Sequence, residues 1–198
     1  MVSTSLREQH ALATRERILS AVAERIERGH ADELTMPGVA EASGVSLRTI
    51  YRYYQTREEL LEAAGRWIGD ELFRHPYPRD LDEVADLYQE GCRDFDERPG
   101  LARALAQSQL GQRARGYRRR ERLEAIRRAL RAELTELGNE ELRQAEAVLG
   151  YLHNILAYTS LREENGLSGE EIGEAVGWAI RTLTADLRSR NQKARRKK

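Results

Sequence analysis

Residues 35–57 read TMPGVAEASGVSLRTIYRYYQTR, and this stretch decides the fold. A short apolar pattern breaks at Gly44 and resumes at once, with three arginines, three tyrosines, three threonines and a single acid around it. Glycine adopts a positive φ at little cost, so Gly44 suits a corner between two short helices. Ser46 follows two residues later and is a favoured helix N-cap. The stretch therefore predicts a helix, a tight turn and a second helix.

The two short helices are predicted from Thr35 to Ala42 and from Ser46 to about Tyr54. Ile50 and Tyr54 lie four residues apart, so they share the inward face of the second helix. The outward face carries Leu47, Arg48, Thr49, Tyr51, Arg52 and Tyr53. A helix of this kind fits the major groove of DNA, with its N-terminal residues at the base edges.

The outward side chains suggest different contacts with DNA. Arg48 suits a bidentate contact with guanine, although a phosphate contact or a free surface position also fits. Leu47 fits either a thymine methyl contact or simple exposure, and the Thr49 methyl suits thymine. The hydroxyls of Tyr51 and Tyr53 suit phosphate oxygens.

Two residues outside the second helix complete the expected DNA-binding set. Thr35 begins the first short helix, where backbone N–H groups point outward and favour phosphate. Arg57 lies in the first turn of the next helix, where a cation opposes the helix dipole and is explained by a facing phosphate. The predicted DNA-binding residues are Thr35, Ser46, Leu47, Arg48, Thr49, Tyr51, Arg52, Tyr53 and Arg57.

The segment resembles the DNA-binding motif of the tetracycline-repressor (TetR) family of bacterial transcription regulators. The matching residues are Thr35, Val39, Ala40, Gly44, Val45, Ser46, Thr49, Tyr51, Tyr54, Arg57, Glu58 and Leu60. Arg48 stands where glycine is frequent, Tyr53 where histidine is frequent, and Tyr54 replaces the usual phenylalanine. The first two departures mean that base contacts cannot be transferred from the family.

The rest of the chain predicts an all-α fold of about nine helices. The last proline is Pro99, and no proline follows in an Ala/Leu/Glu/Arg-rich half, which favours continuous helices. The predicted parts are a flexible N-terminal arm (1–13), a three-helix helix-turn-helix domain (14–75, motif 35–54), a helical ligand-binding and dimerisation domain (80–188) and a basic disordered tail (189–198). Within the third part, one helix is expected to run from Asn139 to about Asn165, and Gly111 is expected to end a shorter helix.

The resemblance implies that the C-terminal helices dimerise and enclose a small-molecule pocket. Candidate pocket residues, chosen from helix faces, are Tyr88, Cys92, Phe95, Leu105, Gln109, Ile126, Leu152, His153 and Leu156. Candidate dimer-interface residues, on helices that are apolar on more than one face, are Val148, Tyr151, Ile155, Val176, Ile180 and Leu183. Cys92 itself fits a buried thiol better than a redox sensor.

Residues 113–131 hold nine arginines and two glutamates. A second DNA contact, a site for an anionic ligand and a solvated helix face all fit this run. The solvated face is the simplest interpretation, because the apolar stripe of the helix is intact and thirty of the 33 basic residues of the chain are arginine.

Composition limits the other function classes. The 33 basic and 33 acidic residues cancel, so net charge gives no information about partners. No apolar run reaches the roughly 18 residues that a membrane span needs, and no export signal is evident, so a cytoplasmic protein is expected. The four histidines lack metal-ligand spacing, and no nucleotide-binding or hydrolase motif occurs, so neither a metal, a cofactor nor an enzyme is expected.

The sequence thus predicts a dimeric, sequence-specific repressor that leaves a palindromic double-stranded DNA operator when a small-molecule effector binds. The alternative is a helical protein-interaction module without a role in DNA-binding regulation, and an α-helical enzyme ranks third.

Overall fold

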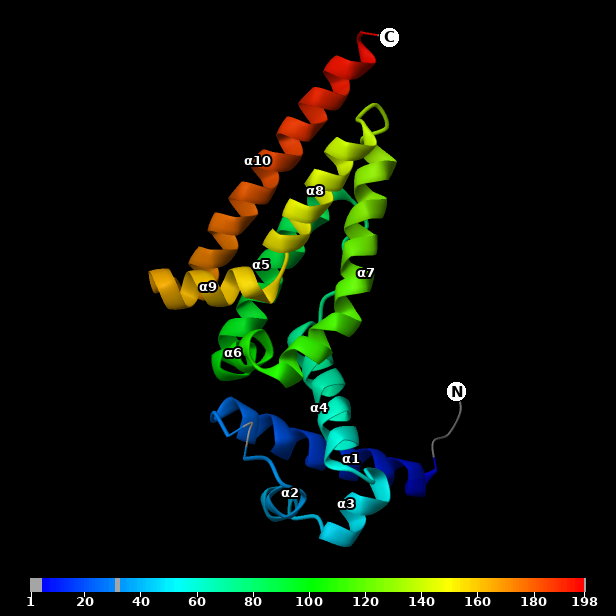
Figure 1. The fold of residues 1–198 in the computed structure, drawn as a ribbon, viewed down its shortest axis with the longest axis vertical. Helices are drawn as coiled ribbons and strands as arrows, with labels where there is room; N and C mark the ends of the chain where they lie inside the picture. Colours follow the sequence, from blue (N-terminus) through cyan, green and yellow to red (C-terminus); the bar gives the residue numbers. More distant parts are fainter. Residues whose placement is uncertain (1–4, 31–32, 198) are drawn as a thin grey trace. The chain divides into compact units, whose positions relative to one another are not determined.

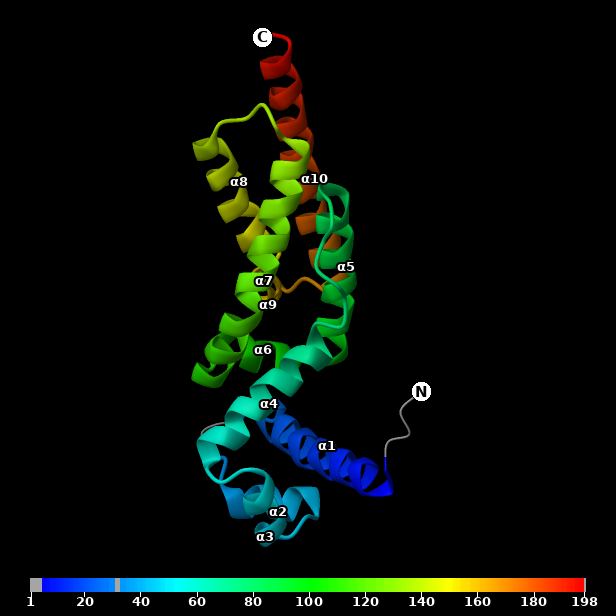
Figure 2. The ribbon, with the colours of Figure 1, turned by 90° about the vertical axis from the view of Figure 1, so that its right-hand side faces the viewer.

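The computed structural model describes residues 5–30 and 33–197, and these residues form an all-α fold (Figures 1 and 2). The helices are α1 (Leu6–Glu27), α2 (Met36–Ser43), α3 (Leu47–Tyr53), α4 (Arg57–Leu72), α5 (Leu81–Glu97), α6 (Pro99–Gln107), α7 (Gln109–Glu133), α8 (Asn139–Leu152), α9 (Ile155–Asn165) and α10 (Gly169–Arg195). The predicted fold class is confirmed, with ten helices in the described part where about nine were expected. None of these helices has both the length and the apolarity that a membrane span requires.

The helices divide into two compact units. The first unit comprises the chain up to Glu71 together with Pro99–Ala114, and the second comprises Leu72–Arg98 together with Arg115–Lys198. Residues 99–114 thus group with the N-terminal helices, although the sequence pattern suggested the C-terminal region. The extents of the two functional domains stay predictions.

The first unit is built on α1, which packs against α2 and α6. Ile18, Val22 and Ile26 lie four residues apart on the apolar face of α1 and are buried. α2 packs in turn on α3, so the two short helices are held against a longer one.

In the second unit, α10 lies along α5, and both views show the two helices side by side (Figures 1 and 2). Three glycines four residues apart, Gly169, Gly173 and Gly177, face α5. A methyl group at Gly169 would lie 2.7 Å from the carbonyl oxygen of Cys92, which is closer than carbon and oxygen can pack. The glycine spacing therefore permits the close approach of the two helices.

Asp96 connects three helices of the same unit. Its carboxylate accepts a hydrogen bond from the Tyr158 hydroxyl of α9 (2.9 Å) and another from the backbone N–H of Gly169 at the start of α10 (2.7 Å). Arg162 forms an ion pair with the same carboxylate. This cluster fixes the turn between α9 and α10 against the end of α5.

The single helix expected over 139–165 is wrong, because the chain breaks between α8 and α9. His153 ends α8 with non-helical backbone angles, and Asn154 is the N-cap of α9. The Asn154 side chain accepts a hydrogen bond from the Leu156 N–H (3.3 Å), and such capping competes with a continuous helix.

The predicted N-terminal arm and the internal stop at Gly111 need correction. Ser5 and Glu8 form a capping box, so α1 begins at Leu6 and residues 6–13 are helical. Gly111 lies inside α7 rather than at a helix end.

The predicted disordered tail is helical as far as Arg195. Arg188 pairs with Asp82 (2.8 Å) and Glu133, and Arg190 pairs with Glu141 (3.2 Å). Asn191 accepts a hydrogen bond from the Glu136 N–H (2.8 Å). These contacts hold the end of α10 against neighbouring helices, although the segment lacks large apolar residues.

Candidate nucleic-acid interface and buried cavity

The corner between α2 and α3 has the geometry that the sequence predicted. Gly44 has a φ of 63°, in the left-handed region, and caps the C-terminus of α2. Val45 is buried directly after it. Arg17 of α1, a residue that the sequence analysis did not single out, donates a hydrogen bond to the Ser43 carbonyl (2.9 Å). This arginine satisfies a carbonyl at the end of α2 that the helix itself leaves unpaired.

The inward and outward faces of α3 are distinct. Ile50 is fully buried and Tyr54 nearly so, which confirms their inward orientation. Leu47, Arg48, Tyr51 and Arg52 are exposed on the opposite side, and Thr49 and Tyr53 are half-buried. α3 therefore presents cationic, aromatic and small apolar groups together on an open surface.

Two guanidinium groups lie over the ring of Tyr53. The guanidinium of Arg15 lies 5.4 Å from its ring centroid and that of Arg52 lies 5.3 Å from it. Such cation–π contacts orient the ring and bring Arg15 of α1 to the edge of the outward face. Arg15 was missed from sequence because nothing in its local pattern indicates a contact 38 residues away.

The hydroxyls of Thr35 and Ser46 serve as helix caps. Thr35 accepts a hydrogen bond from the Gly38 N–H (3.2 Å), and Ser46 accepts one from the Thr49 N–H (3.2 Å). The Ser46 and Thr49 hydroxyls are also 2.8 Å apart. Their local role is thus the placement of α2 and α3, and their contacts with DNA stay predictions.

Arg57 also has a structural partner. Its Nε donates a hydrogen bond to the Leu34 carbonyl (2.7 Å), which ties the start of α4 to the segment before α2. A facing phosphate is therefore not needed to explain a cation at this position. Contact with DNA through the rest of the guanidinium stays a prediction.

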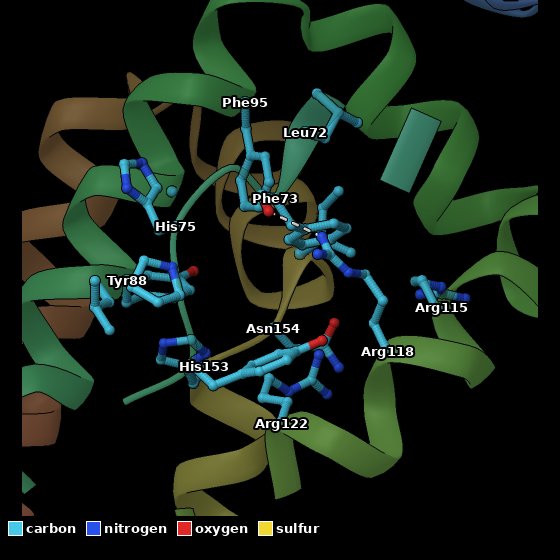
Figure 3. Close-up of a pocket in the computed structure, with 15 residues that line it drawn as sticks. Leu72, Phe73, His75, Tyr88, Phe95, Arg115, Arg118, Arg122, His153 and Asn154 are labelled. Atoms are coloured by element: carbon cyan, nitrogen blue, oxygen red, sulfur yellow. Dashed lines mark hydrogen bonds between the residues drawn. The ribbon is translucent and has the colours of Figure 1, made fainter. Parts of the chain in front are cut away.

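The second unit contains a cavity of about 60 Å³ (Figure 3). Of the predicted pocket residues, Tyr88, Phe95 and His153 line it. Other lining residues were not predicted from the sequence, among them Leu72, Phe73, His75, Arg115, Arg118 and Arg122. Figure 3 shows the three arginines projecting from α7, with Tyr88 and His75 across the cavity from them.

The remaining predicted pocket residues do not line this cavity. Cys92 and Ile126 are buried in the helix packing, and Leu152 and Leu156 are half-buried elsewhere. Leu105 belongs to the first unit, and the Gln109 side chain lies outside the described part. Leu152 and Leu156 were misassigned because the helix expected over residues 139–165 breaks after α8, so one apolar face does not continue from α8 into α9. Cys92 is buried, which confirms the buried thiol that the sequence favoured, and burial raises the pKa of this thiol to about 12.

Among the described side chains of the second unit, three large apolar ones are exposed. Val148 and Tyr151 of α8 are 49% and 59% exposed, and Trp178 of α10 is 68% exposed. Ile155, Val176 and Ile180, which were expected in a dimer interface, are instead buried within the chain, and Leu183 is half-buried. From the sequence, Trp178 fits a ligand cavity, the core or a dimer interface equally well, and its exposure rules out the core of the chain.

The chain matches known proteins in one segment and in its fold. Residues 18–64 match the sequence model of a protein family that is described as "Bacterial regulatory proteins, tetR family". No curated protein matches the chain. A transcriptional regulator from Rhodococcus sp. Rha1 has a similar structure, with a TM-score of 0.60 and 22% identity over 87% of this chain and 96% of the other. A putative TetR-family regulator from Syntrophomonas wolfei gives a TM-score of 0.64 and 14% identity over 88% and 96%. At these identities the structures show a shared fold.

Proposed function

We propose that this chain is a member of the tetR family of bacterial regulatory proteins and acts as a homodimeric, sequence-specific DNA-binding repressor. The observation that carries the proposal is the exposed outward face of α3, placed beyond the Gly44 corner inside the matched segment 18–64. A helix presented in this way enters the major groove with its first turns at the base edges.

The proposed readout divides between bases and phosphates. Arg48 and Leu47, exposed in the first turn of α3, are the proposed base-reading residues. Tyr51 and Tyr53, with Arg52 beside them, are the proposed phosphate contacts, because hydroxyls and guanidinium groups position a protein on the DNA backbone. Arg15, stacked on Tyr53, joins this set.

Dimerisation is proposed because one recognition helix reads too few base pairs. Two copies on a palindromic operator place their recognition helices roughly 34–36 Å apart, one turn of DNA. Val148, Tyr151 and Trp178 support an interface on α8 and α10, since large exposed apolar side chains commonly mark protein contacts.

Regulation by a small molecule is proposed from the cavity in the second unit. A ligand there would release DNA by favouring a dimer conformation whose recognition helices do not fit the two half-sites. No catalytic role is proposed, and the proposed compartment is the cytoplasm, where bacterial DNA lies.

A gel-shift titration with the DNA upstream of the gene for this chain tests the proposal. The repressor is expected to shift this DNA and to leave a scrambled duplex of equal length unshifted at the same salt concentration. The absence of a shift, together with a monomer in solution, would favour the alternative of a helical interaction module.

A further inference from the structure

The arginine-rich part of α7 does two different things along its length. Arg127 forms ion pairs with Glu146 (2.7 Å) and Glu124 (3.0 Å) on the surface, as a solvated face would. Arg115, Arg118 and Arg122 instead line the cavity. Their spacing of three and four residues places them on one side of the helix. The run is therefore a solvated face only in part.

Arg122 is the most deeply buried of these three arginines, and no acidic side chain pairs with it among the described residues. Arg122 is 9% exposed, and its buried Nε has no hydrogen-bond partner among the described residues. The titratable groups that act on it are Tyr77, which raises its pKa, and Arg119 and Arg115, which repel it and lower its pKa. No carboxylate is among them. Burial is the main cause that lowers its pKa to about 10, so the guanidinium stays positive at neutral pH.

Arg118 has partners inside the protein. Its Nη1 donates a hydrogen bond to the Phe73 carbonyl (2.9 Å; Figure 3), and its guanidinium lies 5.4 Å from the Phe73 ring centroid. It therefore forms a fixed wall of the cavity and adds positive potential next to Arg122. Asp94 and Glu90, acids near this region, lie 3.0 and 3.1 Å from the ring nitrogens of His75 rather than against Arg122.

Two neutral polar groups face the same space. His153 has a buried Nε2 without a hydrogen-bond partner in the described chain, and burial together with the charge of Arg122 lowers its pKa to about 4. The Tyr88 ring lies 5.8 Å from the His153 ring. The buried Tyr88 hydroxyl also has no partner of ordinary hydrogen-bond geometry, since the neighbouring Cys92 thiol is at best a weak one.

The rest of the wall is apolar. Leu72, Phe73, Phe95 and Ile155 line the cavity beside these polar groups. A buried cation and buried polar atoms without partners are costly, whereas an apolar wall gains from contact with an organic surface. The combination is that of a ligand site with few polar groups that fix the orientation of the ligand.

We propose that this cavity binds a small organic carboxylate, whose anionic end is held by Arg122 and whose apolar body packs against Phe73 and Phe95. The planar guanidinium matches a carboxylate in a two-bond fork. His153 and the Tyr88 hydroxyl bind the remaining oxygen lone pairs or a polar substituent of the ligand. That the bound carboxylate acts as an effector rests on the proposed function. Binding of the carboxylate to the cavity itself requires no DNA.

Calorimetric titration of the full chain without DNA tests the charge requirement. The probes are benzoate, phenylacetate, hexanoate and octanoate, each beside its uncharged amide, with inorganic phosphate as a simple anion. At least one carboxylate is expected to bind saturably and at least about 30-fold more tightly than its amide. Equal binding of carboxylate and amide, binding of phosphate as strong as any carboxylate, or no saturable carboxylate binding would overturn the proposal.

Two substitutions locate the site. Arg122→Gln is expected to weaken carboxylate binding about 30-fold or more, whereas Arg128→Gln, at an exposed position of the same helix, leaves it unchanged. Arg122→Met removes the buried charge and is expected to match or exceed the wild-type melting temperature without ligand, and to lose the stabilisation by the bound carboxylate. A folded Arg122→Met variant that binds carboxylate like the wild type would contradict the assignment.

The two proposals fail separately. Carboxylate binding without a DNA shift would refute the repressor function and leave the cavity assignment standing. A specific DNA shift with no preference for carboxylate over amide would refute the cavity assignment alone. When both hold, the bound carboxylate is expected to reduce the gel shift of wild type and not that of Arg122→Gln.

Discussion

The Nη2 atom of Arg17 lies 2.9 Å from the carbonyl oxygen of Ser43, so α1 closes the end of α2 at the point where the chain turns into α3. The second carbonyl at this corner, that of Gly44, lies 3.5 Å from the same nitrogen. The orientation of the recognition helix therefore depends on a residue 26 positions earlier in the chain.

Arg17→Ala is expected to lower the free energy of unfolding by about 1–3 kcal/mol, because a charged hydrogen bond to the corner is lost. Urea denaturation followed by circular dichroism measures the change. Arg28→Ala, which removes only an exposed ion pair with Glu24 (3.7 Å), is the control and should change stability by less than about 0.5 kcal/mol. Equal effects of the two substitutions would remove the role given to Arg17.

Gly44→Ala is expected to lower the free energy of unfolding by about 1–2 kcal/mol. A side chain at a φ of 63° is strained, and its Cβ would lie 3.2 Å from Arg17 Nη2. Gly116 of α7 has open space around its Cα, so Gly116→Ala should stabilise the chain by about 0.5–1 kcal/mol. Thermal unfolding of both variants gives the comparison. A stabilised Gly44→Ala variant would show that the turn has another conformation.

Arg48→Ala is expected to lose discrimination between operator and scrambled DNA by about 1–3 kcal/mol, with little change in binding to random DNA. Arg57→Ala should weaken binding to all sequences and reduce the salt dependence by about one phosphate contact. Because Arg57 also holds the Leu34 carbonyl, its variant should unfold at a lower temperature too. Fluorescence anisotropy at several salt concentrations measures these effects, and parallel losses on both DNAs for Arg48→Ala would contradict its base-reading role.

His153 predicts a loss of stability in mild acid. Its pKa is lowered from 6.5 to about 4 by burial and by the charge of Arg122, so the unfolded chain takes up a proton before the folded chain does. As pH falls from 6.5 to about 4, the free energy of unfolding of wild type should therefore fall by about 1–3 kcal/mol relative to that of His153→Gln. The lower part of this range allows for the partial exposure of His153. Urea titrations at pH 7 and pH 4.5 measure the difference. A constant difference between the two proteins would show that the imidazole is not desolvated.

Trp178→Glu is expected to shift the chain from dimer to monomer, because a charge at the centre of an apolar contact is not compensated. Size-exclusion chromatography with light scattering gives the mass. Leu12→Glu changes an exposed leucine of α1 in the same way and should leave the dimer intact. A dimer that resists Trp178→Glu would place the interface elsewhere.

The helix-turn-helix was predictable because its signals are local. A glycine at the corner, a serine cap and an apolar pair four residues apart lie within about ten residues, and each has a specific backbone requirement. The buried Ile50 and the positive φ of Gly44 confirm these predictions. The same signals could not show that Arg15 and Arg17 of α1 reach the motif, because that contact depends on tertiary packing.

The cavity was less predictable for a similar reason. The helix break at His153 and Asn154 depends on one side-chain cap, which apolar periodicity does not register. The sequence does not show which of the nine arginines is buried, because they occur in similar sequence contexts along the run. Only the packing of α5, α7 and the α8–α9 break separates the cavity-lining arginines from the solvated ones.

A stoichiometric titration of operator DNA shows directly whether the chain binds as a dimer and discriminates between DNA sequences. The duplex upstream of the gene is titrated with the chain at concentrations far above the dissociation constant and followed by fluorescence anisotropy. Saturation is expected at two chains per palindromic site, and the affinity for scrambled DNA is expected to be lower by a factor of about 1,000 at physiological salt. Saturation at one chain per site, or equal affinity for the two duplexes, would contradict a dimeric, sequence-specific repressor.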